Sequence, residues 1–204
     1  MLPHQVAFCG IFTLVFMYFK FLLIWRFARI WALGDGIETA DNISSCIFCN
    51  HTFRGFWRSW HSSFNLWIVR YIYKGLGGRR SQLWSIWIIF FFVGLWHDLW
   101  WSWVAWAMLN CLCFSLEIIL TAIFSKKFAW MQNRWYFSYL SDAFGALDLL
   151  LVTLANMSIM LGFKGSFDVV ARYIHDAGSL TLILSLLSYY ATVHFQRIKK
   201  IYIA

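Results

Sequence analysis

The sequence predicts an all-α, multi-pass transmembrane protein with about four to six spans and further re-entrant or interfacial helices. Three observations support this fold class: of 204 residues, 61% are hydrophobic, 22% are aromatic and only 13% are charged. A soluble domain is about 45–50% apolar and about 25% charged, so this chain could not cover its surface with polar groups in water. The composition therefore excludes a soluble globular enzyme, and its many large apolar side chains exclude a disordered chain.

The spans follow from the length of the apolar runs, because a helix needs about 20 mostly apolar residues to cross the hydrocarbon core. Residues 6–25 form the first such run. Residues 82–124 form a longer run, which must turn back on itself, and we place the turn at or after Gly94. Residues 136–163 and 180–195 supply two later spans.

The positive charges predict the orientation of these spans. Fourteen of the 17 Lys and Arg residues fall on one side of the predicted spans and two on the other, with Lys20 inside the first span. The positive-inside rule assigns the fourteen to the cytoplasm, so the N-terminus is expected in the lumen. The charges form short clusters between apolar runs instead of one basic face, so no nucleic-acid partner is expected.

Residues 56–74 are too polar to span the bilayer and too aromatic for an ordinary loop. Their aromatic side chains recur at mostly three- and four-residue steps, which predicts a helix with an aromatic stripe. His61 lies in the middle of this segment, and Arg58 and Asn65 interrupt the stripe. We expect the segment to lie in the interface or to enter the bilayer as a re-entrant helix.

A glycine-rich stretch at residues 75–80 ends in Arg79 and Arg80. It has two interpretations, a phosphate-binding loop and a simple turn. The turn is favoured, because clustered glycines are typical of turns.

His97 and Asp98 lie among some of the most apolar residues of the chain. Ionisable groups at membrane depth are costly and usually functional. The alternative is a histidine at the water interface within an aromatic belt, and on composition alone the two interpretations are even. The presence of His61 in a second apolar segment favours a functional site.

The five cysteines predict neither a disulfide framework nor a metal centre, since their number is odd and three lie inside apolar runs. Cys46-Ile-Phe-Cys49, with His51 beside it, supplies half of the ligands of a zinc site. No second pair has suitable spacing, so an ordinary or palmitoylated loop thiol is preferred and no metal is expected. The other histidines in the sequence are interpreted as incidental, among them His194.

Several short motifs occur in an order that resembles the membrane-bound O-acyltransferase (MBOAT) family. W-R-x-W-H-x-S lies at residues 57–63, R-Y-x-Y at 70–73, a Gly-Gly turn at 77–78 and W-H-D at 96–98. Residues 25–38 are similar to the glycerol-uptake-like (Gup) branch, also known for acyltransferases that remodel glycosylphosphatidylinositol (GPI) anchors. The resemblance implies a single membrane domain, residues 1–204, with an MBOAT-like core at about 12–117 and C-terminal helices at 136–204.

The resemblance also implies an activity. Family members transfer an acyl chain from a thioester such as acyl-CoA to a hydroxyl or amine, in a chamber inside the membrane. For this chain the implied acceptor is a hydroxyl of a lipid or glycolipid, and the expected location is the endoplasmic reticulum membrane. Acyl-CoA enters as co-substrate, and no other cofactor is expected.

Site residues are implied where this sequence matches the family motifs. His97 matches the histidine after the apolar run and is the implied general base, while His61 matches a more variable position that positions or polarises the reacting groups. The residues expected to bind substrate are Asn65, Arg58, Arg79 and Arg80. The chemistry agrees, because a hydroxyl attacks a thioester poorly until a base such as neutral imidazole removes its proton. Donors to the oxyanion could be His61, Asn65 or an indole N–H.

Family members are usually about twice this long, so the resemblance is expected to cover their C-terminal half only. Another membrane protein chain is therefore an expected partner, beside the membrane lipids. The alternative function is a non-catalytic MBOAT-derived subunit of a larger complex, in this or another organelle membrane. Transport has little support, because no paired repeat of spans is found.

Cooperation between His61 and His97 sets a condition on the fold. A straight helix over residues 81–97 would rise about 24 Å, too far for a histidine at the surface to reach its end. We therefore expect the His61 segment to enter the bilayer and the His97 segment to be tilted, or broken near Gly94.

Overall fold

The computed structural model describes residues 3–44, 46, 50, 52–127, 130, 134–176 and 178–203, and within them the elements are helical apart from one isolated bridge. The α-helices are α1 (Pro3–Gly34), α2 (Phe53–Ser59), α3 (Ser62–Ile68), α4 (Gln82–His97), α5 (Trp101–Lys127), α6 (Phe137–Asp176) and α7 (Gly178–Ile203). A π-helical turn, η2 (Val69–Tyr73), and a 3-10 turn, η3 (Gly78–Ser81), connect α3 to α4. The predicted all-α class is confirmed.

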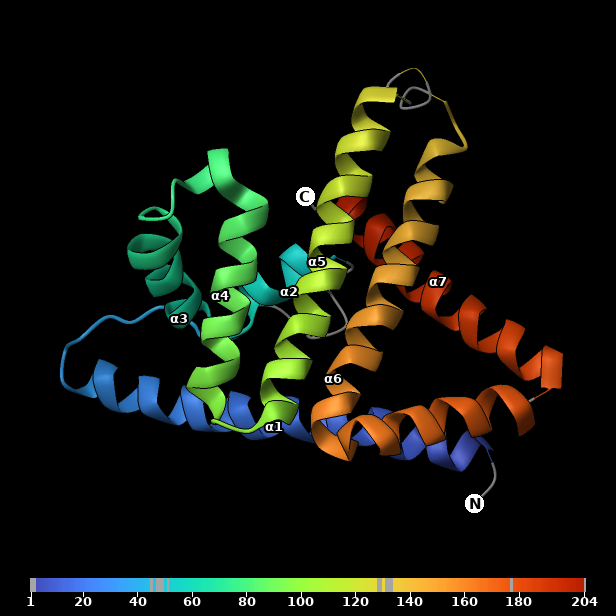
Figure 1. The fold of residues 1–204 in the computed structure, drawn as a ribbon, viewed down its shortest axis with the longest axis horizontal. Coiled ribbons are helices and arrows are strands. Elements are labelled where there is room, and N and C mark those ends of the chain that lie inside the picture. Colours follow the sequence, from blue (N-terminus) through green and yellow to red (C-terminus); the bar gives the residue numbers. More distant parts are fainter. Residues whose placement is uncertain are drawn as a thin grey trace.

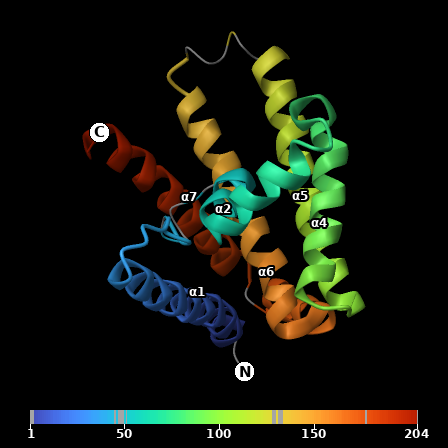
Figure 2. The same ribbon diagram turned by 90° about the vertical axis from the view of Figure 1, so that its left-hand side faces the viewer.

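The long helices form two crossed groups. Helices α4, α5 and the first part of α6 lie side by side, and α1 runs crosswise to them and packs on α6 (Figure 1). The short helix α2 packs on α5 and α6, between α1 and the α4–α5 pair (Figure 2). The first expected span therefore lies crosswise to α4, α5 and the first part of α6.

Helices α4 and α5 form the predicted hairpin, with the turn directly after His97. Their contact is a buried apolar cluster that consists of Ile86, Phe90, Trp106, Ala107 and Cys111. Of the two alternatives expected for the His97 segment, a tilt or a break near Gly94, the break is contradicted, because α4 is helical from Gln82 to His97. Gly94 instead lets the two helices approach closely, since its backbone lies against Ala107.

The aromatic segment predicted as one helix is broken at His61. Helix α2 ends at Ser59, Trp60 is extended, and His61 adopts a left-handed conformation before α3 starts. Trp60 forms the isolated antiparallel bridge with Ile43, so a backbone contact with an earlier loop competes here with the helix. The periodicity alone could not reveal that contact.

The glycine-rich stretch forms a turn, as favoured. Gly77 and Gly78 have φ values of +97° and +59°, a region open to glycine and costly for other residues. The turn reverses the chain between η2 and α4, so that α3 and α4 run antiparallel.

Helix α6 bends at Gly162, which has φ 71° and ψ 164°. Beyond this bend the helix turns to lie crosswise, beside α1 (Figure 1). Helix α7 packs back on α6 through a buried cluster of Ala146, Leu149 and Val193.

Two helices of the described chain are long and apolar enough to cross a membrane by length and composition: α5, and α6 over Phe137–Ile159. Large apolar side chains also face outward, for example Leu99 (84% exposed) and Trp100 (70% exposed) at the α4–α5 turn. Such a surface requires a cover of lipid or protein.

Candidate functional site

The backbone of His61 has φ 48° and ψ 55°, and His61 is the non-glycine residue of the described chain with positive φ. This conformation costs a side-chain-bearing residue about 1 kcal/mol. It turns the imidazole toward Trp25 of α1 and Phe64 of α3, with ring centroids 4.7 and 5.3 Å away. A strained backbone at a histidine is typical of a functional position.

The antiparallel pairing of α3 and α4 brings the start of α3 to the end of α4. Phe64 stacks on Trp96 with ring centroids 4.4 Å apart, and Trp67 stacks on Phe92 at 6.1 Å. The two helices therefore run side by side in opposite directions. His61 comes close to the end of α4 by this route, without any break in α4.

His97 is the last residue of α4, and its ring is held between two indoles of α5. It stacks on Trp103 with centroids 4.8 Å apart and an interplanar angle of 10°, and it meets Trp106 edge-on at 5.4 Å. The side chain remains exposed on one side. The neighbouring Asp98 accepts a hydrogen bond from the backbone N–H of Leu99 at 2.7 Å, so its carboxylate supports the turn.

The ring of Trp96 contacts both imidazoles, with centroid distances of 6.4 Å to His61 and 5.0 Å to His97. The structure thus brings together the two histidines that the motifs singled out. Burial lowers the pKa of His61 from its ordinary value, which favours the neutral imidazole at pH 7.

Three buried nitrogens around this pair lack a hydrogen-bond partner in the described part of the chain. They are His61 Nδ1, Trp57 Nε1 and Trp106 Nε1. Buried polar atoms are normally satisfied, and exceptions often mark a site that binds a further group. The rings of Trp57 and Trp106 are 5.7 Å apart, and Trp106 in turn contacts His97 at 5.4 Å.

A pocket of about 420 Å³ lies next to the site, between α2, α3, α4 and α5. Arg58 and Asn65 line it together with Arg54 and Gln82, while the remaining lining is largely apolar, including Trp57. This combination suits a long apolar chain that carries a polar or anionic head.

Arg79 and Arg80 are not among the lining residues of that pocket. They lie exposed in η3, just before α4 begins, whereas His97 ends α4. The 16 residues of α4 rise about 24 Å. Of the four residues expected to bind substrate, the structure therefore gathers Arg58 and Asn65 and leaves Arg79 and Arg80 apart.

A second polar cluster was missed by reasoning from sequence. Asp142 of α6 is 3% exposed and accepts from His194 Nδ1 at 2.8 Å and from Arg197 Nη2 at 2.9 Å, both on α7. Tyr139 and Tyr190 both stack on the His194 ring, with centroids 5.6 and 5.8 Å away. The interpretation of His194 as incidental was therefore wrong. The available signal was an acidic residue in one predicted span, Asp142, and His194 and Arg197 at the end of the next.

Cys49 and His51 of the Cys46 motif lie outside the described residues.

Asp148 of α6 and Glu117 of α5 line a pocket of about 350 Å³ between these helices, and Glu117 accepts a hydrogen bond from the backbone N–H of Arg54 at 3.1 Å.

The fold and the site define an all-α membrane protein with two imidazoles gathered on one tryptophan beside an amphipathic pocket. The chain belongs to the MBOAT, membrane-bound O-acyltransferase family, whose model matches residues 4–164. His61, His97 and the pocket residues all fall within the matched range, whereas His194 and Arg197 lie beyond it.

Individual relatives agree with this family. The chain is 34% identical over 176 residues to "Membrane-bound O-acyltransferase GUP1" of Candida tropicalis, which covers 86% of this chain and 29% of that protein. It is 35% identical over 185 residues to "Membrane-bound O-acyltransferase gup1" of Schizosaccharomyces pombe; the alignment covers 89% of this chain and 31% of that protein. A more distant relative, "Protein-cysteine N-palmitoyltransferase HHAT" of Mus musculus, is 31% identical over 111 residues; the alignment covers 50% of this chain and 21% of that protein. The chain thus spans less than a third of the length of these relatives.

Proposed function

We propose that this chain carries the histidine site of a membrane-embedded acyltransferase. The reaction moves a fatty acyl chain from acyl-CoA to a hydroxyl of a lipid or glycolipid acceptor. The observation that carries this proposal is that the rings of His61 and His97 both contact the ring of Trp96. Beside them lie buried indole nitrogens that have no hydrogen-bond partner in the described part of the chain.

In this proposal His97 is the general base. It removes the proton of the acceptor hydroxyl, the oxygen attacks the thioester carbonyl, the carbon–sulfur bond breaks, and CoA leaves as a thiol after taking up the proton. Stacking on Trp103 holds the imidazole in one orientation. The indole N–H of Trp106 or of Trp57 supplies a donor for the oxyanion, since both are buried and unpaired in the described chain.

The pocket between α2 and α5 suits acyl-CoA. Arg58 offers a positive charge to the phosphates of CoA, Asn65 offers polar contacts, and the apolar lining accommodates part of the acyl chain. Arg79 and Arg80 remain candidates for contact with anionic groups at the membrane surface.

The family supports a membrane setting, and the finer assignments belong to this proposal. We assign a multi-pass topology in the endoplasmic reticulum membrane, with lipids and acyl-CoA as partners. For the acceptor we propose a lipid-linked hydroxyl such as that of a GPI anchor, on the resemblance of residues 25–38 to the glycerol-uptake-like branch. The palmitoyltransferase name of the mouse relative supports a long acyl chain.

A second function is favoured by one observation. His97 and Trp96 are exposed, so the site is open on one side in this chain. A non-catalytic subunit of a larger membrane complex would keep this fold for assembly, whereas an enzyme needs further protein to cover the site.

Reconstitution into lipid vesicles tests the two functions. The purified protein, supplied with labelled acyl-CoA and a lipid acceptor, is expected to form labelled acyl-lipid. Native mass spectrometry of the gently solubilised protein shows whether another chain accompanies it. A stable complex without any transfer activity would favour the subunit and contradict the enzyme.

A further inference from the structure

The first turn of α3 is capped by a residue that lies far upstream of it. Asn42 Oδ1 accepts hydrogen bonds from the backbone N–H of Ser63 at 3.0 Å and from Ser63 Oγ at 2.6 Å. The backbone oxygen of Asn42 accepts from the N–H of Ser62 at 3.0 Å. His61, which occupies the N-cap position, makes no capping hydrogen bond with its own side chain. Asn42 therefore satisfies N–H groups that α3 would otherwise leave unpaired.

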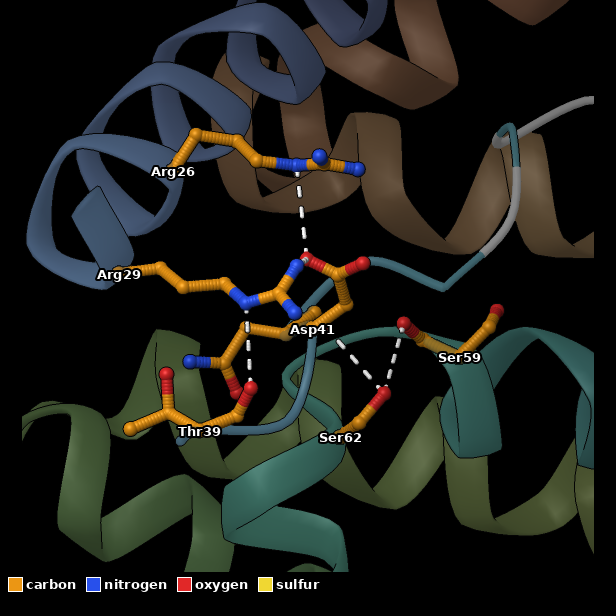
Figure 3. A network of polar contacts seen from close by, with 7 residues as sticks. Arg26, Arg29, Thr39, Asp41, Ser59 and Ser62 are labelled. Atoms are coloured by element: carbon orange, nitrogen blue, oxygen red, sulfur yellow. Dashed lines mark hydrogen bonds and ion pairs between the residues drawn. The ribbon is translucent and has the colours of Figure 1, made fainter. Parts of the chain in front are cut away.

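The loop that holds Asn42 is fastened to α1. Arg29 Nη1 contacts Asp41 Oδ1 at 2.8 Å, and Arg29 Nε donates to the backbone oxygen of Thr39 at 3.1 Å. Arg26 adds a longer contact to Asp41 at 3.5 Å. Figure 3 shows both arginines reaching from α1 to Asp41, close to Ser59 and Ser62 at the junction of α2 and α3. Two arginines and one carboxylate thus fix the loop beside the histidine.

The same loop also holds the residues before His61. Ile43 forms the antiparallel bridge with Trp60, and the N–H of Ser44 donates to the oxygen of Ser59 at 3.3 Å. His61 is therefore flanked on both sides by residues bonded to one short stretch of chain. A left-handed conformation of a non-glycine residue persists only where its surroundings determine it in this way.

One face of α1 both packs on His61 and holds the loop that contains Asn42. Trp25 and Arg29 are four residues apart, so they lie on the same side of the helix. Trp25 packs on the imidazole of His61 at 4.7 Å, while Arg29 holds the loop. If the loop moved away from α1, the Arg29–Asp41 contact would be lost, and His61, which is bonded to the loop through its neighbours, would move away from Trp25.

We propose that Asn42 is a positioning residue for His61, and that the Arg29–Asp41 pair holds Asn42 in place for this task. The cap keeps His61 left-handed, so that its ring stays against Trp25 and Trp96 and its buried Nδ1 faces the site. This role rests on the proposed acyltransferase function, in which His61 positions or polarises the reacting groups.

The first experiment compares Asn42→Ala with Asn42→Asp in the reconstituted protein. Asn42→Ala removes the acceptor, while the carboxylate of Asn42→Asp keeps an oxygen for Ser63. Turnover is expected to fall by up to about a hundredfold in Asn42→Ala, through kcat more than KM, and to recover in Asn42→Asp. Asn156→Ala is the matched control, because among the described residues this asparagine bonds only a backbone oxygen of its own helix, that of Val152 at 2.8 Å.

A double-mutant cycle separates positioning from general damage. If Asn42 acts through His61, Asn42→Ala should cause no further loss of turnover in a His61→Ala background. An equal loss in both backgrounds would overturn the proposal, because the residue would then act on the fold. Wild-type turnover in Asn42→Ala would overturn it as well.

A readout independent of activity uses diethyl pyrocarbonate, which acylates accessible imidazole nitrogens. Mass spectrometry of the modified protein should show faster labelling of His61 in Asn42→Ala than in wild type or Asn42→Asp, with His97 as internal reference. Equal labelling of His61 in all three proteins would refute the positioning role. If labelling of His61 changes as expected but the wild-type protein has no transfer activity, the proposed function is refuted, while the positioning of His61 by Asn42 is supported.

Discussion

Gly94 of α4 packs directly against Ala107 of α5: a Cβ atom on Gly94 would lie 3.0 Å from the Cβ of Ala107 and 3.1 Å from the Cα of Val104. Two backbones approach this closely only where one residue has no side chain. The contact lies one turn before His97, so it fixes the distance between that histidine and its tryptophan neighbours on α5.

The first prediction concerns this contact. Gly94→Ala is expected to destabilise the protein by about 1–3 kcal/mol, because an added methyl group overpacks a helix contact that cannot yield locally. The measurement is the unfolding midpoint in detergent. Gly34→Ala is the control, since a Cβ there meets nothing within 4 Å. Equal midpoints for wild type and Gly94→Ala would show that α4 and α5 can separate freely.

The second prediction concerns the base. His97→Ala should lower the rate of acyl transfer by at least about a hundredfold, because no other group would take the hydroxyl proton. Asp98→Asn should have a smaller effect, since Asp98 contacts the backbone of the turn. Transfer of labelled acyl groups in vesicles measures both. Normal turnover of His97→Ala would remove this histidine from the mechanism.

The third prediction compares two arginines. Arg58→Ala is expected to raise the KM for acyl-CoA about tenfold, the loss of one charge-assisted hydrogen bond. Arg79→Ala should raise it less, because Arg79 does not line the pocket. Initial rates at varied acyl-CoA concentration distinguish the two. A larger effect for Arg79 would move the CoA site to the surface before α4.

The fourth prediction concerns Asp142. Asp142→Ala should destabilise the protein by about 3 kcal/mol, because it leaves the partly buried Arg197 without its counter-charge. Asp176→Ala is the matched control, since Asp176 also pairs with a histidine, His175, but at the exposed end of α6. Its effect should be below about 1 kcal/mol. Similar midpoints for the two variants would show that the Asp142 cluster adds nothing to the packing of α7.

The fifth prediction concerns pH. Because burial lowers the pKa of His61, the unfolded chain takes up a proton at this residue before the folded one does. The stability that His61 contributes should be constant above the ordinary pKa of about 6.5. It should be lost as the pH falls from there through the lower folded value. Unfolding midpoints of wild type and His61→Gln between pH 5 and pH 8 provide the test, and equal pH dependence would contradict the assignment.

Much of the fold follows from local sequence. Apolar runs of the required length predict α5 and the first part of α6, and the turn after His97 follows from a run too long for one crossing. The Gly77-Gly78 reversal follows from the conformational freedom of glycine. These features depend on residues close together in the chain, so they can be predicted without knowledge of the packing.

The motifs also singled out His61 and His97, because histidines are uncommon among such apolar residues. Sequence alone predicted one helix through His61, which is wrong, because α2 ends at Ser59 and α3 begins only at Ser62. It left a tilt or a break near Gly94 as alternatives for the His97 segment, and the structure contradicts the break, because α4 is continuous through Gly94. The break at His61 arises from the Ile43–Trp60 bridge and the Asn42 cap, which join residues about twenty positions apart. Periodicity carries no information about such contacts.

Sequence by itself determined that this is a helical membrane protein of the acyltransferase family, and that His61 and His97 lie in its motifs. Only the tertiary structure decided that the antiparallel run of α3 along α4 brings them to one tryptophan. It also decided that Arg58 and Asn65, but not Arg79 and Arg80, line one pocket, and that His194 pairs with Asp142. The physical reason is that burial and helix formation depend on local composition, whereas the meeting of distant side chains depends on how whole helices pack.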